Sequence, residues 1–125
     1  MTSKIKKTIM IVEDIKMHMG LMDDLLRPAG YATVGTNKGR KAVNLARKHH
    51  PDLILMDIQL GDISGLEVTK KLKEDKDLKD IPIIAVTAFA QKGDREMMLA
   101  AGCDDYIPKP IRVANFLETV KKNLA

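Results

Sequence analysis

Three carboxylates, one hydroxyl and one amine stand at or just after the ends of short apolar runs in this chain of 125 residues: Glu13, Asp14, Asp57, Thr87 and Lys109. Carboxylates brought to one place repel one another, so a site that gathers three of them is costly unless a cation lies among them. Side-chain oxygens, with no Cys or His among them, suit a hard ion such as magnesium, which keeps several of its waters. A single acid at the end of a strand is more often a helix cap or a solvated loop residue. That all five residues stand at or just after the ends of strands is poorly explained by coincidence. These residues therefore predict a magnesium site with a lysine and a hydroxyl beside it.

The elements that position these residues alternate between strands and helices. Strands are predicted at the apolar runs 8–12, 32–36, 53–57, 83–87 and 105–108. The first, third and fourth runs are continuously apolar, which is typical of strands covered on both faces. Apolar residues recur at helical spacing between and after the runs, most clearly in 22–29 and 113–124, and Ser64 is the predicted N-cap of another helix. This alternation predicts an α/β fold, a parallel sheet with helices on both faces that binds its ligands at the carboxyl ends of the strands.

Length and composition bound the class of protein. A chain of 125 residues, of which 45% are hydrophobic and 30% charged, fits one globular domain that folds without a metal or disulfide staple. No apolar run approaches the roughly 20 residues that cross a bilayer, and the polar start has no signal-peptide core behind it. The single cysteine, Cys103, excludes an internal disulfide and a zinc site built from cysteines. We expect a cytoplasmic protein that has no membrane partner.

The net charge of +4 leaves a nucleic-acid partner open as a class. Aromatic residues are only 3% of the chain and none is Trp, so platforms for stacking single-stranded bases are scarce. The basic residues are scattered along predicted helix faces rather than gathered in one run. The charge is therefore interpreted as a contribution to solubility, and no nucleic-acid partner is expected.

The motifs around these positions form an ordered set that covers essentially the whole chain: 11–14, 51–57, 65–67, 82–88 and 102–110. The set resembles the receiver domain of two-component response regulators, and residues 1–125 are interpreted as one such domain without an output domain. The phrases 56–60 and 86–90 are most similar to the DivK type, single-domain regulators of bacterial cell division and polarity. The resemblance implies the flavodoxin-like (βα)5 fold, with a five-stranded doubly wound parallel sheet in the order 2-1-3-4-5.

The same resemblance implies a role for each acid. Asp57 would be the phosphoacceptor, whose carboxylate attacks phosphorus to give an acyl phosphate. Glu13, Asp14, Asp57 and the backbone carbonyl of Gln59 would hold Mg²⁺, with Mn²⁺ as a substitute. The ion would neutralise charge on the transferring phosphoryl group, and positioning would do most of the remaining work.

The resemblance also implies a switch. Lys109 would reach the phosphoryl oxygens as a point charge, and a cis peptide would precede Pro110. Thr87 would donate a hydrogen bond to the phosphoryl group, and Tyr106 would turn inward to fill the vacated space; read without the resemblance, Tyr106 is equally well a half-buried aromatic. The readout surface would comprise the helix 91–101, the strand of Tyr106 and the C-terminal helix.

The predicted function is that of a stand-alone switch. It would take phosphoryl groups from a histidine kinase or a histidine phosphotransfer protein, act on a downstream protein target in cell-cycle control, and show only self-phosphorylation and slow autodephosphorylation. A chemotaxis-type receiver would have the same active site and stays open as an alternative. An aspartyl-nucleophile phosphatase would place a second Asp at the position of Gln59, so its general acid is missing. A flavin-binding flavodoxin would not follow its first strand with Glu13 and Asp14, which repel phosphate, and a DNA-binding regulator would need a further domain after Ala125.

Three further positions carry predictions of their own: Gly61, Ile15 and His18. The family usually has proline four residues after the acceptor, whereas this chain has Gly61, which predicts a more mobile loop. Ile15 follows Asp14 where a polar residue is common, which predicts a changed lifetime of the phosphoryl group. His18 is interpreted as a lone exposed histidine on a helix.

Overall fold

Strands and helices alternate along the described chain, which comprises residues 6–88 and 92–125 of a computed structural model. The strands are β1 (Thr8–Val12), β2 (Ala32–Thr36), β3 (Leu53–Asp57), β4 (Ile83–Thr87) and β5 (Asp105–Pro108). The helices are α1 (Lys16–Leu26), α2 (Ala42–His49), α3 (Gly65–Glu74), α4 (Lys92–Ala101) and α5 (Val113–Leu124), with a short 3-10 helix, η1 (Gly39–Lys41), before α2. The five strands begin and end where the apolar runs predicted them.

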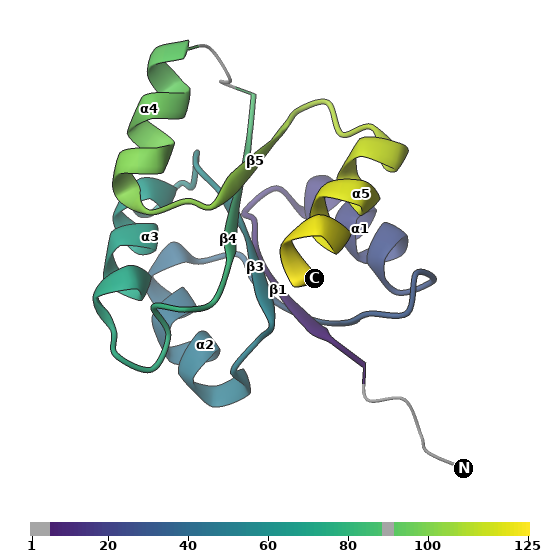
Figure 1. The fold of residues 1–125 in the computed structure, drawn as a ribbon, viewed down its shortest axis with the longest axis horizontal. Helices are drawn as coiled ribbons and strands as arrows, with labels where there is room; N and C mark the ends of the chain where they lie inside the picture. Colours follow the sequence, from purple (N-terminus) through teal and green to yellow (C-terminus); the bar gives the residue numbers. More distant parts are fainter. Residues whose placement is uncertain (1–5, 89–91) are drawn as a thin grey trace.

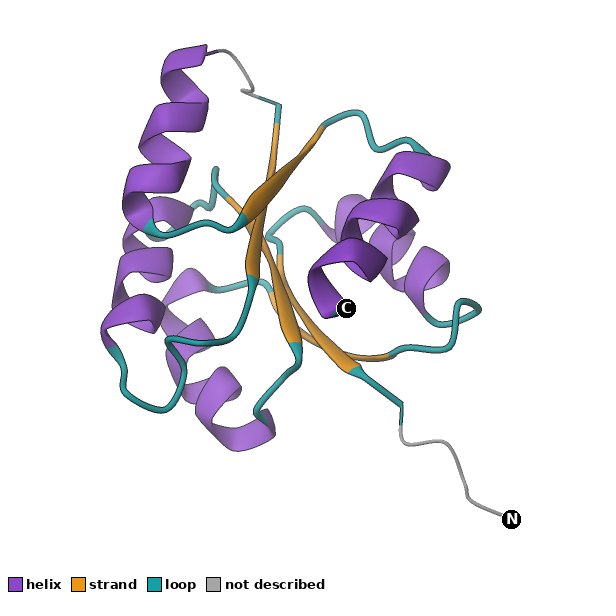
Figure 2. Ribbon diagram, viewed as in Figure 1, coloured by secondary structure: helices purple, strands orange, loops and turns teal. Residues whose placement is uncertain are grey.

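All five strands are parallel and form one sheet in the order β2-β1-β3-β4-β5. Helices α2, α3 and α4 lie on one side of the sheet, and α1 and α5 lie on the other (Figure 1). Figure 2 shows the resulting three layers, helix, sheet and helix. The predicted flavodoxin-like, doubly wound fold is confirmed. Among residues 6–88 and 92–125, none of the helices combines the length and the apolar character that spanning a bilayer requires.

The sheet separates two apolar layers because successive side chains of a strand point to opposite faces. Met10 and Ile54 are partners on neighbouring strands and pack in the layer under α2, α3 and α4. The preceding pair, Ile9 and Leu53, packs on the other face with Phe116 of α5. Strands β3 and β4 are buried throughout, and β1 is buried after its first residue. The continuously apolar runs are therefore the central strands, as predicted.

The start of α3 fixes the loop that follows Asp57. Ser64 caps the helix, since its side chain accepts a hydrogen bond from the Leu66 N–H at 3.2 Å. A Cβ on Gly65 would lie 2.1 Å from the carbonyl oxygen of Asp57, so a larger residue cannot bring α3 this close to β3. The Gly65 N–H donates to the Ile58 carbonyl at 3.0 Å and closes the loop. The residues after Asp57 are thus held at both ends.

Candidate functional site

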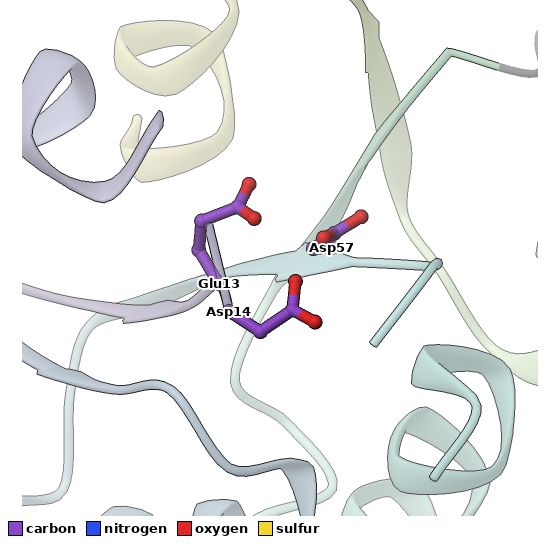
Figure 3. Close-up of side chains that lie close together, drawn as sticks. All are labelled: Glu13, Asp14 and Asp57. Atoms are coloured by element: carbon purple, nitrogen blue, oxygen red, sulfur yellow. The ribbon is translucent and has the colours of Figure 1, made fainter. Parts of the chain in front are cut away.

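The three predicted metal-ligating side chains converge at the carboxyl ends of β1 and β3. Val12 is the register partner of Met56, so Glu13 and Asp14 leave β1 at the level where Asp57 ends β3. One oxygen from each of the three carboxylates lies within 4.8 Å of the other two. Figure 3 shows the side chains as neighbours at these strand ends. The sheet order reverses between β1 and β3, which is the place where sheets of this kind bind ligands.

Glu13 is fully buried and uses both carboxylate oxygens within the protein. Its Oε1 lies 2.9 Å from Lys109 Nζ, and its Oε2 accepts a hydrogen bond from the Ile15 N–H at 3.1 Å. The main chain of Ile15 therefore supports the acidic site while its side chain is exposed. A buried carboxylate needs such partners, because an unpaired charge away from water is costly.

Asp57 is 2% exposed at the end of β3. Its Oδ1 accepts a hydrogen bond from the Gln59 N–H at 3.0 Å, and its Oδ2 lies 3.9 Å from Lys109 Nζ. Burial, followed by the neighbouring Glu13, raises the pKa of Asp57 to about 6, against the opposing effects of the Gln59 N–H and of Lys109. The Gln59 N–H is thus a hydrogen-bond donor to the Asp57 carboxylate, while the use of the Gln59 carbonyl as a metal ligand stays a prediction.

Asp14 has one oxygen that is hydrogen-bonded and one that is not. Its Oδ2 accepts from the Gly61 N–H at 2.9 Å. Its Oδ1 is buried and has no hydrogen-bond partner among the described residues. An orphaned buried oxygen beside two further carboxylates is the donor set that a hard cation such as magnesium prefers, so these residues fit the predicted ion.

Lys109 is brought to the site by the end of β5. Its N–H donates to the Thr87 carbonyl at 2.8 Å, and the peptide bond to Pro110 is cis, as expected. Its Nζ lies 2.9 Å from His18 Nδ1 as well as 2.9 Å from Glu13 Oε1. The prediction that His18 is a lone histidine is wrong because of this contact, while its side chain is 37% exposed. Its place in the first turn of α1, four residues after Asp14, indicates that it lies near the acidic pair, but it does not reveal the contact with Lys109.

Thr87 and Tyr106 lie on β4 and β5, the two strands that follow β3 in the sheet. Thr87 is 1% exposed at the end of β4, the strand next to β3, and it lines a small cavity together with Met97 and Met98 of α4. Tyr106 is half-buried on β5, and the guanidinium carbon of Arg95 lies 5.0 Å from the centre of its ring. The helix predicted over 91–101 corresponds to α4, which begins at Lys92. Gln91, and residues 89–90 of the phrase 86–90, lie outside the described residues.

Comparisons with known proteins agree with this geometry. The family model described as the response regulator receiver domain matches residues 9–121. The polar-differentiation response regulator DivK of Brucella ovis is 58% identical over 118 residues, which cover 94% of this chain and 96% of that protein. The similarity to the DivK type, first indicated by the phrases 56–60 and 86–90, therefore extends over nearly the full length of the chain.

Two receiver structures illustrate the likeness to solved structures, and each covers 96% of this chain. The receiver domain of a sensor histidine kinase from Pseudomonas aeruginosa, which carries a magnesium ion coordinated in its active-site cleft, has a TM-score of 0.88, 32% identity and 98% of its own length covered. A CheY-like receiver domain protein from Methanospirillum hungatei has a TM-score of 0.88, 28% identity and 94% of its length covered. The match over residues 9–121 and the likeness to DivK show that the chain belongs to the response regulator receiver domain family.

Proposed function

We propose that this chain is a stand-alone response regulator that accepts a phosphoryl group on Asp57 in a magnesium-dependent reaction. The observation that carries the proposal is the gathering of three carboxylates within 4.8 Å, with Lys109 Nζ 3.9 Å from Asp57 Oδ2. The donor would be a phosphohistidine on a histidine kinase or phosphotransfer protein, as membership of the receiver family implies. A single domain over residues 1–125 is supported by the relative from Brucella ovis, which is matched over 96% of its own length.

Asp57 is the group best placed to react. The Gln59 N–H orients one of its oxygens, and the other oxygen lies on the side of Lys109. That oxygen attacks the donor's phosphorus, and a P–O bond forms while the P–N bond to the donor's imidazole breaks. The electron pair of the broken bond stays on the imidazole nitrogen. Water later attacks the phosphorus of the acyl phosphate, the P–O bond to Asp57 breaks, and inorganic phosphate and the free carboxylate are released; this slow autodephosphorylation resets the switch.

The neighbouring residues stabilise the charge that arrives with the phosphoryl group. Bound magnesium supplies charge neutralisation for the phosphoryl oxygens. Glu13 and Asp14 would hold the ion together with Asp57. Lys109 turns its ammonium group from Glu13 toward the phosphoryl oxygens. Thr87 donates a hydrogen bond from its hydroxyl to the same phosphoryl group. These are positioning and electrostatic roles, which is what transfer of a phosphoryl group requires.

Phosphorylation would change the surface formed by α4, β5 and α5. Movement of the Thr87 hydroxyl toward the phosphoryl group enlarges the cavity beside Met97 and Met98, and Tyr106 turns from its contact with Arg95 into that space. To invert a 1:99 population, the phosphorylated state must favour the active form by about 5.5 kcal/mol. A few charge-assisted hydrogen bonds at about 1.5–3 kcal/mol each supply this amount.

The biological role we propose is control of cell polarity and the cell cycle. It is supported by the identity of 58% to a protein named as a polar-differentiation response regulator. The location that we propose for this role is the cytoplasm. Profiling phosphotransfer from candidate kinases distinguishes this role from chemotaxis.

An apolar contact surface for a protein donor lies next to the site. On α1, Met17 is 79% exposed and Leu21 is 43% exposed, and both line a groove together with Lys109.

The test of the function is phosphorylation by a small phosphodonor with magnesium, read by intact mass. We expect one added phosphate on the wild type and none on Asp57→Asn, because the amide cannot form the acyl phosphate. Asp24→Asn is the matched control, since Asp24 is an exposed residue of α1. It should take up one phosphate like the wild type. Phosphate on Asp57→Asn, or none on the wild type, would contradict the assignment.

A further inference from the structure

We infer that the backbone N–H of Gly61 is a positioning group for the metal ligand Asp14, a role that the proline usual at this position of the family cannot perform. The inference rests on the proposed function, because it concerns how the acidic cluster is prepared for its cation. Gly61 lies in the loop between β3 and α3, and Asp14 follows β1, 47 positions away along the chain.

The contact is specific to one carboxylate oxygen. The Gly61 nitrogen lies 2.9 Å from Asp14 Oδ2, a normal length for a charge-assisted hydrogen bond. The other oxygen, Oδ1, is the buried atom that has no hydrogen-bond partner among the described residues. The bond to Oδ2 therefore fixes the rotation of the carboxylate and leaves Oδ1 for the cation.

Glycine contributes in two ways that differ from proline. It retains an N–H, which proline lacks. It also lacks a Cβ, and a Cβ at this position would lie 3.2 Å from Asp14 Oδ2, which is a tight contact. No positive φ is found at Gly61, so backbone freedom is not what this position requires. The departure from the family pattern thus supplies a donor.

The loop that carries Gly61 is also anchored through its neighbour Asp62. The carboxylate of Asp62 accepts hydrogen bonds from the N–H groups of Gly39 and Arg40, both at 3.1 Å. The same loop supplies the Gln59 N–H to Asp57. One loop therefore orients two of the three clustered carboxylates through its main chain. The sequence predicts greater mobility for this loop because glycine stands at position 61, and that prediction stays untested. The Gly61 N–H is hydrogen-bonded to Asp14.

The consequence is a preorganised ligand. Partners that orient a metal ligand typically change metal affinity about 10–100-fold when they are removed. Gly61→Pro removes the N–H and adds a Cβ, whereas Gly61→Ala keeps the N–H and adds the same Cβ. The difference between the two variants therefore measures what happens at Asp14 Oδ2 when the donor N–H is exchanged for a ring carbon of proline. Because proline is usual here in the family, Gly61→Pro is compatible with the fold.

The experiment is a magnesium titration of the wild type and both variants by calorimetry at pH 7.5. Amide NMR spectra without metal serve as the check that all three proteins are folded. We expect Gly61→Ala to bind magnesium within about threefold of the wild type and Gly61→Pro about tenfold more weakly than Gly61→Ala. We also expect the amide proton of residue 61 to shift on metal addition in the wild type and in Gly61→Ala.

Each outcome decides between the two proposals. If Gly61→Pro and Gly61→Ala both bind magnesium as tightly as the wild type, the role of Gly61 is overturned and the proposed function is left intact. An absence of magnesium binding by the wild type overturns the proposed function itself. A Gly61→Ala variant as weak as Gly61→Pro assigns the effect to the added Cβ and overturns the role of the N–H.

Discussion

Lys109→Met is expected to lower both the stability and the phosphorylation rate of the protein. Lys109 Nζ lies 2.9 Å from Oε1 of the fully buried Glu13, so its loss leaves a buried carboxylate without its cation. Removing one partner of a buried ion pair costs about 3–5 kcal/mol, and we expect about 2–4 kcal/mol because the Ile15 N–H still donates to Glu13. Denaturant unfolding at pH 7.5 without divalent ions measures this change.

The matched control for this variant is Lys122→Met. Lys122 Nζ lies 3.3 Å from Asp105 Oδ2, but the Lys122 side chain is 73% exposed. Solvent screens such a pair, so the expected loss is less than about 1 kcal/mol. A similar loss of stability in Lys109→Met and Lys122→Met would show that the Lys109–Glu13 pair has no special weight.

A double variant separates the structural role of Lys109 from its chemical role. Adding Glu13→Gln to Lys109→Met removes the unpaired charge and should restore most of the stability. Phosphorylation by a small donor should stay about 100-fold or more below the wild-type rate, because the double variant lacks both the Lys109 charge and the carboxylate of Glu13, which is proposed to hold magnesium. Recovery of the phosphorylation rate together with the stability would assign Lys109 a structural role alone.

Asp57→Asn is expected to stabilise the metal-free protein at neutral pH. Burial and Glu13 raise the pKa of Asp57 from 3.8 to about 6, so the folded state holds this proton more tightly than the unfolded chain does. Between about pH 4 and pH 6 the folded wild type therefore binds more protons, and its stability falls as the pH rises through that window. Above it, the ionised carboxylate costs about 1–3 kcal/mol, which the amide avoids while it still accepts from the Gln59 N–H.

Denaturant unfolding of the wild type and Asp57→Asn at pH 4 and pH 7.5 tests the sign. The advantage of the variant should be present at pH 7.5 and small at pH 4, where Asp57 of the wild type is protonated in the folded state. Magnesium at pH 7.5 should reduce the advantage, because a bound cation stabilises the ionised wild type. A variant that is less stable than the wild type at pH 7.5 would disprove the raised pKa.

The strands could be predicted from the sequence because the apolar residue types in each run indicate that the run is buried. The runs 53–57 and 83–87 are apolar at nearly every position, and such runs can bury both faces only in the middle of a sheet. The register of β1 against β3 then brings Glu13 and Asp14 to Asp57, since parallel strands end at the same edge. The strands and their central place in the sheet thus follow from the apolar pattern, whereas the strand order that puts β1 beside β3 came from the family resemblance.

The contacts of His18 and Gly61 could not be predicted in this way. His18 meets Lys109 across 91 positions, and the contact depends on how α1 is rotated and where β5 ends. Gly61 acts through its main chain, which residue type does not reveal. The role of Asp57 as acceptor came from the family resemblance, because three carboxylates of similar chemistry are not distinguished by their spacing alone.

The most direct measurement is the magnesium affinity of the metal-free protein at pH 7.5, determined by calorimetry for the wild type, Asp14→Asn and the control Asp24→Asn. We expect one site on the wild type and on Asp24→Asn, and binding at least about tenfold weaker on Asp14→Asn, whose orphaned Oδ1 would be part of the site. Equal affinities of the wild type and Asp14→Asn would contradict the central claim that these acids form the cation site.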